Sequence, residues 1–296
     1  RKAMISSLNE SIGEVMRASG VAQVVASRHP DYAVGELVQG QFGWQDYAIS
    51  SGGEGMLGGV SRVPEGVPPE RMLSVLGGTG LTAYFGMTEI GRIAAGDRVL
   101  VSGAAGATGS VAGQIARILG AAEVVGIAGG PEKCAWLTEG LGFDAAIDYR
   151  AEDVRRRLRT LFPEGVDLFF DNVGGQILDD AFLNMARGGR IVICGGISQY
   201  NEAELPPGPR NYMQIVIRRL EVRGFILIDH LDGVPAARGQ LAQWLASGEL
   251  VGREDIAEGF DATPATFLRL FRGQNIGKQL LRVARPPLPV IPPRTS

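Results

Sequence analysis

A glycine-rich loop that follows an apolar run is the part of this sequence best suited to bind a phosphate. Gly103, Gly106 and Gly109 stand three residues apart, directly after the predicted strand 98–102 and before a predicted helix. Such a loop lets a pyrophosphate approach the backbone, and the following helix presents its positive N-terminus to the anion. The apolar run Val124–Ala128 completes a strand–loop–helix–strand unit. The pattern predicts dinucleotide binding, with a glycine-rich helix packed tightly on a sheet as the alternative.

The end of the second strand indicates which dinucleotide this unit would take. A unit that binds NAD places Asp or Glu about 20 residues after the glycines, where the carboxylate bonds the ribose 2′-hydroxyl. Here Gly129 and Gly130 occupy that place, and Lys133 follows. An uncharged position beside a cation favours a 2′-phosphate, so we expect NADP(H). The alternative is that Lys133 is an ordinary solvated lysine.

The composition limits the classes of protein to which the chain can belong. Its 296 residues, 45% of them hydrophobic, can bury a large core and should form two domains. The net charge of −3 predicts no nucleic-acid partner and no anionic membrane surface. No apolar run reaches the roughly 18 residues of a membrane span and no signal peptide is recognisable, so we expect a cytoplasmic protein. Two cysteines and two histidines without zinc-ligand spacing predict a site without metal.

Strands and helices alternate after residue 96, which is typical of an α/β protein with a doubly wound parallel sheet. The predicted strands are nearly continuous apolar runs, as expected when helices cover both faces of the sheet. They are residues 98–102, 123–128, 145–148, 166–170, 190–194 and 222–228, with helices at 131–141, 151–161, 176–186 and 235–247.

The two ends of the chain depart from this alternation. The first 78 residues are predicted to be β-rich, with strands at 21–26, 37–38 and 42–48 and a short helix at 68–76. A last helix at 264–271 and a last strand at 278–283 precede the proline-rich segment 286–296, which we expect to be a flexible tail. Capture of this tail by a groove that binds polyproline is the less favoured alternative.

Several motifs in one order allow the chain to be compared with a known family. They are LTAYFG from Leu81, GAAGATGSVAGQIA from Gly103, GPEK from Gly130, DNVGG from Asp171, CGGISQYN from Cys194, LPPGP from Leu205 and NIGK from Asn275. From Gly13 to Val283 the chain resembles the zinc-independent medium-chain dehydrogenase/reductases of the prostaglandin reductase (leukotriene B4 12-hydroxydehydrogenase) and curcumin reductase group. The resemblance implies a β-rich GroES-like catalytic domain (1–78 and 240–285) around a Rossmann NADP-binding domain (79–239).

The resemblance also implies the residues that bind NADP(H). Gly106, Ala107, Thr108 and Gly109 would form the pyrophosphate turn, and Lys133 and Tyr149 would hold the adenosine 2′-phosphate. The remaining residues, expected to line the nicotinamide and its ribose, are Asn172, Cys194, Gly195, Gly196, Ile197, Ser198, Tyr200, Phe225, Ile226, Leu227 and Asn275.

The implied activity is NADPH-dependent reduction of the carbon–carbon double bond of a small apolar α,β-unsaturated ketone or aldehyde. Hydride would reach the β-carbon while negative charge builds on the carbonyl oxygen, where one well-placed donor is worth about 3–4 kcal/mol. Tyr200 is the candidate catalytic donor, with a purely cofactor-contacting or solvent-facing tyrosine as the alternative. In this family the ribose 2′-hydroxyl can donate instead. Ile217 stands where some relatives carry a tyrosine, and Asp171 is interpreted as a strand-end cap rather than an acid.

Two other functions stay open: an NADPH quinone oxidoreductase and a non-catalytic NADPH-binding protein. Family analogy predicts a homodimer, formed by edge pairing of the predicted strand Glu221–Ile228. Members carry a longer segment before the part that resembles Ile12–Arg17, and the junctions at 9–12 and 53–58 look abrupt. We therefore expect that the first strands are lost or that segments of a longer protein are omitted, which puts some substrate contacts out of reach.

Overall fold

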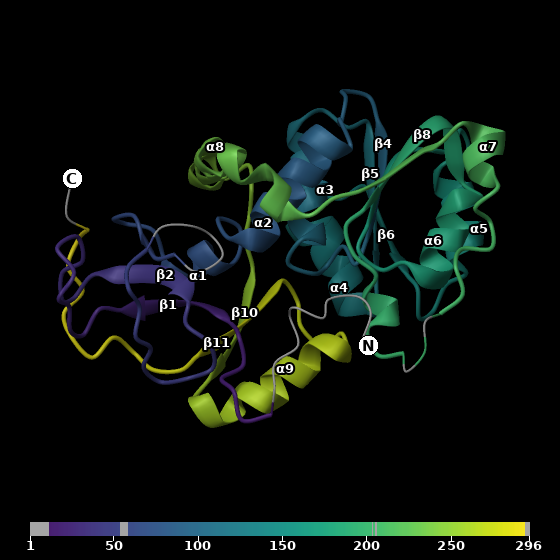
Figure 1. The fold of residues 1–296 in the computed structure, drawn as a ribbon. Helices are drawn as coiled ribbons and strands as arrows, with labels where there is room; N and C mark the ends of the chain where they lie inside the picture. Colours follow the sequence, from purple (N-terminus) through teal and green to yellow (C-terminus); the bar gives the residue numbers. More distant parts are fainter. Residues whose placement is uncertain (1–11, 54–58, 203, 205, 294–296) are drawn as a thin grey trace.

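The computed structural model describes residues 12–53, 59–202, 204 and 206–293, and its largest sheet is parallel and six-stranded (Figure 1). The strands lie in the order β6-β5-β4-β7-β8-β9. This is the order of two mononucleotide-binding halves that meet between β4 and β7. The predicted α/β class with a Rossmann sheet is confirmed. The strands are β4 (Arg98–Ser102), β5 (Glu123–Ala128), β6 (Ala145–Asp148), β7 (Val166–Asp171), β8 (Met185–Ile193) and β9 (Glu221–Gly224).

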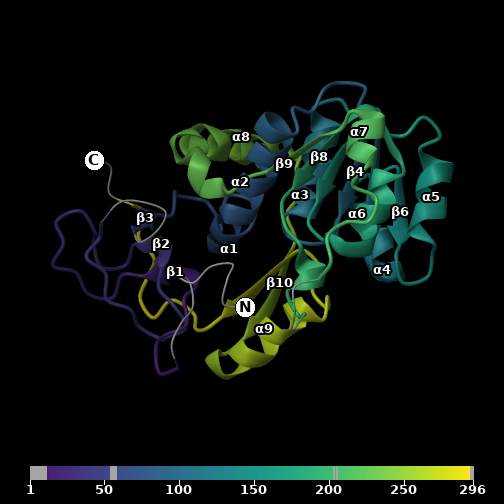
Figure 2. The same ribbon diagram turned by 45° about the vertical axis from the view of Figure 1, so that its right-hand side comes forward.

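Helices cover both faces of this sheet, as Figures 1 and 2 show. They are α2 (Gly78–Phe85), α3 (Gly109–Ile118), α4 (Pro131–Ala135), α5 (Val154–Leu161), α6 (Gly175–Phe182), α7 (Gln214–Arg218) and α8 (Val234–Ser247). Val101 and Phe170 are buried on the face covered by α2, α3 and α8, whereas Leu100 and Phe169 are buried on the face covered by α5 and α6. Adjacent residues of one strand thus enter two different cores, which explains the continuous apolar runs.

The largest differences between the predicted elements and the structure concern four of them. The predicted strand 42–48 does not form, because the backbone turns at Gly43 (φ +72°) and Trp44 packs edge-on against Phe267. The predicted strand 222–228 ends at Gly224, since the ring of Phe225 turns inward to the position beside Gly86. The predicted helix 176–186 stops at residue 182, so that β8 begins five residues before its predicted start.

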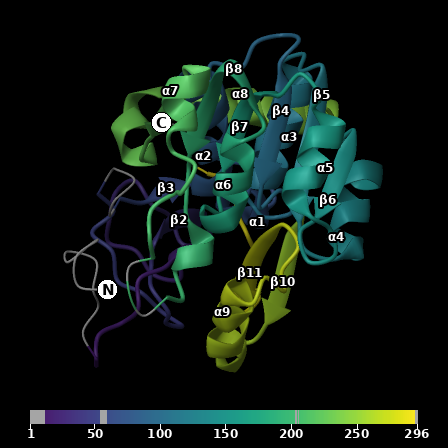
Figure 3. The same cartoon turned by 90° about the vertical axis from the view of Figure 1, so that its right-hand side faces the viewer.

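The remaining strands form two small sheets. β1 (Ser19–Gln23), β2 (Leu37–Gln41) and β3 (Ser61–Arg62) are antiparallel, and α1 (Pro69–Leu73) follows them; β10 (Glu254–Glu258) and β11 (Lys278–Arg282) are parallel and lie beside α9 (Thr263–Phe271). Figure 3 shows β10, β11 and α9 grouped below the large sheet. The predicted division into a GroES-like and a Rossmann domain stays a prediction. Helix α8, which crosses its boundary at residue 240, packs on α2.

The proline-rich tail lies against the first strands of the chain. The side chain of Gln23 holds the backbone of Leu288 from both sides, donating to its carbonyl and accepting from its N–H, each at 3.0 Å. The N–H of Ile291 donates to the carbonyl of Gly35 at 3.2 Å. These bonds place the tail against the first strands as far as residue 291, through a glutamine that composition does not reveal, and the flexibility of the tail stays a prediction. The predicted junctions at 9–12 and 53–58 fall almost entirely outside the described residues.

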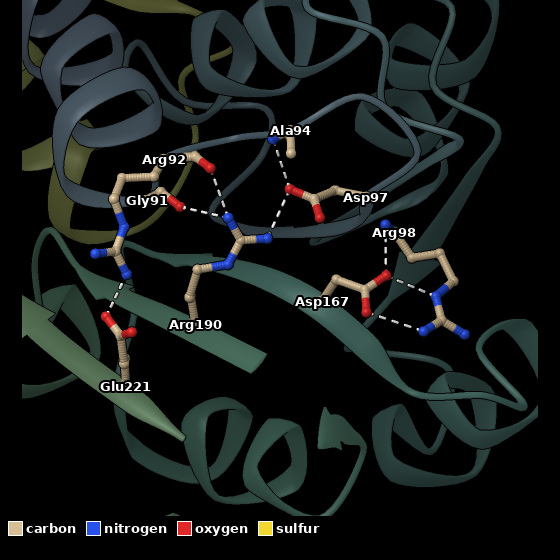
Figure 4. A network of polar contacts seen from close by, with 8 residues as sticks. All are labelled: Gly91, Arg92, Ala94, Asp97, Arg98, Asp167, Arg190 and Glu221. Atoms are coloured by element: carbon tan, nitrogen blue, oxygen red, sulfur yellow. Dashed lines mark hydrogen bonds and ion pairs between the residues drawn. The ribbon is translucent and has the colours of Figure 1, made fainter. Parts of the chain in front are cut away.

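A network of charged side chains ties together the amino ends of the central strands (Figure 4). Arg98 of β4 forms a fork with Asp167 of β7 at 2.8 and 2.9 Å. Arg190 of β8 pairs with Asp97 at 2.7 Å and also donates to two carbonyls of the preceding turn. The network is completed by Gly91, Arg92, Ala94 and Glu221. Because this edge lies opposite the glycine loop, we assign the network to stability.

The pKa of Asp167 makes this network sensitive to acid. Burial would raise that pKa, but the hydrogen bonds and charge of Arg98 outweigh it and hold the pKa below 3.8. A lowered folded-state pKa stabilises the protein above the unfolded value and loses this contribution as the pH falls through the folded one. We therefore expect the difference in unfolding free energy between the wild type and Asp167→Asn to shrink below about pH 4. Urea unfolding across this range measures it, and a constant difference would contradict the assignment.

Candidate active site

The glycine loop joins β4 to α3 at the carboxyl edge of the sheet, where open α/β sheets bind their ligands. Gly103 has a φ of +57°, which side chains disfavour. A Cβ on Gly109 would lie 2.4 Å from the carbonyl oxygen of Gly103, so only glycine lets α3 begin this close to the strand. Ala107 and Thr108 complete the turn. A loop this tight, with a helix directly after it, fits a pyrophosphate held by backbone N–H groups.

The segment before β11 closes against this loop. Gly277 forms a parallel bridge with Gly106, and its N–H donates to the carbonyl of Ala105 at 2.8 Å. The side-chain nitrogen of Asn275 donates to the carbonyl of Gly277 at 2.9 Å. The structure thus joins the turn that contains Asn275 to the glycine loop through Gly277, and the amide nitrogen of Asn275 stabilises this turn.

The end of β7 lies beside the end of β4, and Asp171 organises this junction. Its buried carboxylate accepts from the Ser102 hydroxyl at 2.6 Å and from the N–H groups of Val173 and Gly174 at 3.0 and 3.1 Å. Burial raises the pKa of Asp171, and these three donors oppose that shift. The contacts support the interpretation of Asp171 as a strand-end cap.

Asn172 lies directly against the glycine loop. A Cβ on Gly103 would be 3.3 Å from the Cβ of Asn172, and the side-chain nitrogen of Asn172 donates to the carbonyl of Ser102 at 2.7 Å. The backbone N–H of Asn172 donates to the hydroxyl of Ser102 at 2.9 Å. The two predicted loops, which are some 70 residues apart in the sequence, are therefore neighbours at the switch point of the sheet.

The loop after β8 is fastened to the turn after β7. The N–H groups of Cys194 and Gly195 donate to the carbonyl of Asp171, that of Ile197 donates to Asn172, and that of Ser198 donates to Val173, all at 2.8–3.2 Å. The hydroxyl of Ser198 also donates to the carbonyl of Val173 at 2.6 Å. These bonds bring the predicted nicotinamide segment to the carboxyl edge of β7.

Tyr200 and Cys194 are the two side chains of this loop that could take part in the reaction. The hydroxyl of Tyr200 accepts from the N–H of Gly196 at 3.5 Å, and the side chain is half exposed. Burial raises the pKa of the Cys194 thiol to about 12, so this thiol stays protonated and is a poor nucleophile. Tyr200 therefore remains the candidate donor in this loop.

The predicted cofactor residues 225–227 are not joined to the rest of the site by hydrogen bonds of the 194–200 loop. The ring of Phe225 lies beside Gly86, next to Phe170 of β7. Ile226 is exposed, and Leu227 begins a short 3-10 helix. The hydrogen bonds that fasten the 194–200 loop do not reach these three residues, so their contact with the nicotinamide stays a prediction.

The predicted 2′-phosphate residues lie at the carboxyl ends of β5 and β6. Lys133 donates to the carbonyl of Gly273 at 2.8 Å, and the N–H of Tyr149 donates to the carbonyl of Ala128 at 3.1 Å. A Cβ on Gly129 would meet the Tyr149 ring at 2.8 Å. This contact gives a physical reason for the missing acid, because a side chain at position 129 would displace the tyrosine. Sequence reasoning missed Gly273, since no pattern in the chain indicates that α9 ends beside Lys133.

Within residues 12–53, 59–202, 204 and 206–293, no group of three or more His, Cys, Asp or Glu side chains is placed to hold a metal ion. Of the helices in the same ranges, none is both long and apolar enough to cross a membrane.

A Rossmann sheet with a glycine loop, and a second loop fastened at its switch point, defines the class: a dinucleotide-binding α/β protein. Comparison with known proteins agrees. The family described as zinc-binding dehydrogenase matches residues 107–247, and the N-terminal domain of oxidoreductase matches residues 2–57. The NADPH-dependent curcumin reductase of Escherichia coli is 39% identical over 278 residues, which are 92% of this chain and 79% of the relative. The 2-alkenal reductase (NADP(+)-dependent) of Nicotiana tabacum is 37% identical, covering 92% of this chain and 78% of that protein.

A solved structure is similar over nearly the whole chain. CurA from Vibrio vulnificus, crystallised in complex with NADPH, has a TM-score of 0.89 and 38% identity, covering 97% of this chain and 85% of CurA. The chain belongs to the zinc-independent branch of the medium-chain dehydrogenase/reductase family, as its motifs predict.

Proposed function

We propose that this protein is an NADPH-dependent reductase of the carbon–carbon double bond in small apolar α,β-unsaturated ketones and aldehydes. The observation that carries the proposal is the site at the switch point. There the 171–175 turn is bonded to the end of β4, directly before the glycine loop, and to the 194–200 loop. The relatives named curcumin reductase and 2-alkenal reductase, and the NADPH complex of CurA, support the same chemistry.

In this proposal, different residues of the chain hold different parts of NADPH. NADPH supplies the hydride for the β-carbon of the substrate. Gly106 to Gly109 hold the pyrophosphate, and Lys133 with Tyr149 hold the 2′-phosphate. Asn172, the 194–200 loop and Asn275 would fix the nicotinamide half. Asn172 is bonded to Ser102 at the end of β4, and the 194–200 loop is bonded to the turn after β7. Asn275 is bonded to Gly277, which bridges to Gly106 of the glycine loop. Phe225, Ile226 and Leu227 would add apolar contacts to the nicotinamide.

The test of the function is an NADPH assay with matched acceptors. Purified protein should oxidise NADPH with an enone, with loss of one double bond per NADPH, and should not turn over the saturated ketone or a quinone. Turnover of quinones alone would support the quinone oxidoreductase instead. Tight NADPH binding without oxidation over a panel of enones and quinones would support a non-catalytic binding protein.

Tyr200 is proposed as a donor to the carbonyl oxygen of the substrate. Its hydroxyl lies at the glycine pair that follows β8, and a donor at that oxygen stabilises the charge that develops during hydride transfer. We expect Tyr200→Phe to lower kcat while the KM for NADPH stays unchanged. Steady-state kinetics measure both values. A raised KM with the wild-type kcat would make Tyr200 a cofactor contact.

We also propose a homodimer formed at the β9 edge of the large sheet. All four residues of β9 are exposed, and further exposed apolar side chains lie in the segments directly before and after the strand. They include Met213, Val216, Ile217, Val222 and Ile226. A second copy would satisfy the open backbone of this edge and cover these side chains.

A cytoplasmic location is part of the proposal, supported by two unpaired cysteines.

The dimer is tested by its mass in solution. We expect a species of twice the 31.4 kDa chain in light scattering, and Ile217→Asp should shift it towards the monomer. A charge buried at an interface is costly without a partner. Leu268→Asp, at an exposed leucine of α9, is the control and should leave the mass unchanged. A wild-type monomer at assay concentration would refute the dimer.

A further inference from the structure

Two positive charges lie together at the carboxyl ends of β5 and β6. Lys133 follows β5 and Arg150 follows β6. Burial is the first cause that lowers the pKa of the Lys133 ammonium, and the charge of Arg150 is the second. Folding therefore brings two like charges close together, which costs free energy unless an anion joins them.

The carboxylates around this pair are engaged elsewhere. Asp148 accepts from the backbone N–H groups of Gly130 and Arg150 at 2.9 and 3.0 Å. Glu152 accepts from the N–H of Asp148 and pairs with an arginine of α5. Asp255 forms a fork with Arg269, and Glu132 faces Arg253 at 3.9 Å. Among the described residues, none forms an ion pair or hydrogen bond with the Arg150 guanidinium.

The position of the Arg150 guanidinium is defined by three neighbours. It lies 5.7 Å from the centre of the Tyr149 ring. A Cβ on Gly129 would be 2.9 Å from its Nε, and a Cβ on Gly273 would be 3.8 Å from one terminal nitrogen. Gly273 is also the residue whose carbonyl accepts from Lys133. Both cations therefore converge on the turn between α9 and β11, beside the place where the second strand of the dinucleotide unit ends.

The side chains of Lys133 and Arg150 together favour a phosphate monoester over a hydroxyl as their ligand. A planar guanidinium without a carboxylate partner can donate two parallel hydrogen bonds to phosphate oxygens, and an ammonium adds a compact second charge. A hydroxyl at the same place would gain little from either cation. We propose that Arg150 is a second phosphate-binding residue that, with Lys133, sets the preference for NADPH over NADH. The inference rests on the proposed use of NADPH.

The experiment compares two adenosine nucleotides that differ in the 2′-phosphate. Titration calorimetry of the full chain with 2′,5′-ADP and with 5′-ADP, at one salt concentration, gives both dissociation constants. We expect Arg150→Ala to weaken 2′,5′-ADP binding about tenfold and to leave 5′-ADP within about twofold. Arg150→Lys should restore part of the loss. Arg156→Ala, at an exposed arginine of α5, is the matched control and should change neither.

The outcomes separate this inference from the proposed function. If Lys133→Ala weakens 2′,5′-ADP binding and Arg150→Ala does not, the role of Arg150 is overturned and the use of NADPH stands. If Arg150→Ala weakens both nucleotides equally, the residue does not read the 2′-phosphate, and the inference is again overturned. If the wild type binds 5′-ADP as tightly as 2′,5′-ADP, the proposed cofactor itself is wrong. Unchanged melting temperatures show that each variant is folded.

Discussion

Lys133→Ala should raise the KM for NADPH about ten- to hundredfold and leave the KM for NADH nearly unchanged. A hydrogen bond to a charged group contributes about 1.5–3 kcal/mol, and only NADPH carries the 2′-phosphate that would receive it. The ammonium is already oriented, because Gly273 accepts one of its three protons at 2.8 Å. Two donors remain for a phosphate. Steady-state kinetics with both cofactors measure the ratio.

The neighbouring glutamate offers a matched control. Glu132 precedes Lys133 on α4 and its side chain is 80% exposed, so Glu132→Ala should leave both KM values within about twofold. A second readout is the pH dependence of binding. Because the pKa of Lys133 lies below 10.5, NADPH affinity should fall as the pH rises through it, whereas NADH affinity should not. Equal changes for the two cofactors in Lys133→Ala would end the assignment.

The central sheet could be predicted because its strands are buried on both faces. The run Val124–Ala128 has no polar residue that would shift its limits, and 166–170 has only Asp167. The structure reproduces both runs closely. The course of the chain could not be predicted where a glycine or a single side-chain contact determines it. Gly43 turns the chain after β2, and the hydrogen bond between Gln23 and Leu288 places the tail beside β1. Apolar periodicity carries no information about either event.

The local structure of the candidate site could be predicted where the contacts that shape it lie within a single motif. Gly103 to Gly109 form such a motif, and so does the DNVGG turn, whose aspartate accepts from its own following N–H groups. The convergence of Lys133, Arg150 and Gly273 joins three segments up to 140 residues apart. A local pattern cannot reveal this meeting, because it depends on how α9 and β11 pack against the large sheet.

Asp171→Ala should destabilise the protein by about 3–5 kcal/mol, the largest loss expected for a single side chain of this site. The substitution leaves the Ser102 hydroxyl and the N–H groups of Val173 and Gly174 without their acceptor in a buried place. Each unsatisfied buried donor costs about 1–3 kcal/mol. Calorimetric melting measures the loss, which should lower the melting temperature of a chain of this length by about 5–8 °C.

Two further variants separate the cap from a catalytic acid. Ser102→Ala removes one of the three donors, so it should cost less than Asp171→Ala, about 1–2 kcal/mol. Asp171→Asn keeps an oxygen acceptor but turns an amide towards the N–H of Gly174, which bonds both carboxylate oxygens at 3.1 Å. It should therefore lower stability while the remaining folded protein keeps its turnover. Wild-type stability with abolished turnover in Asp171→Asn would instead make Asp171 the acid, and would remove the reason to look for a donor at Tyr200.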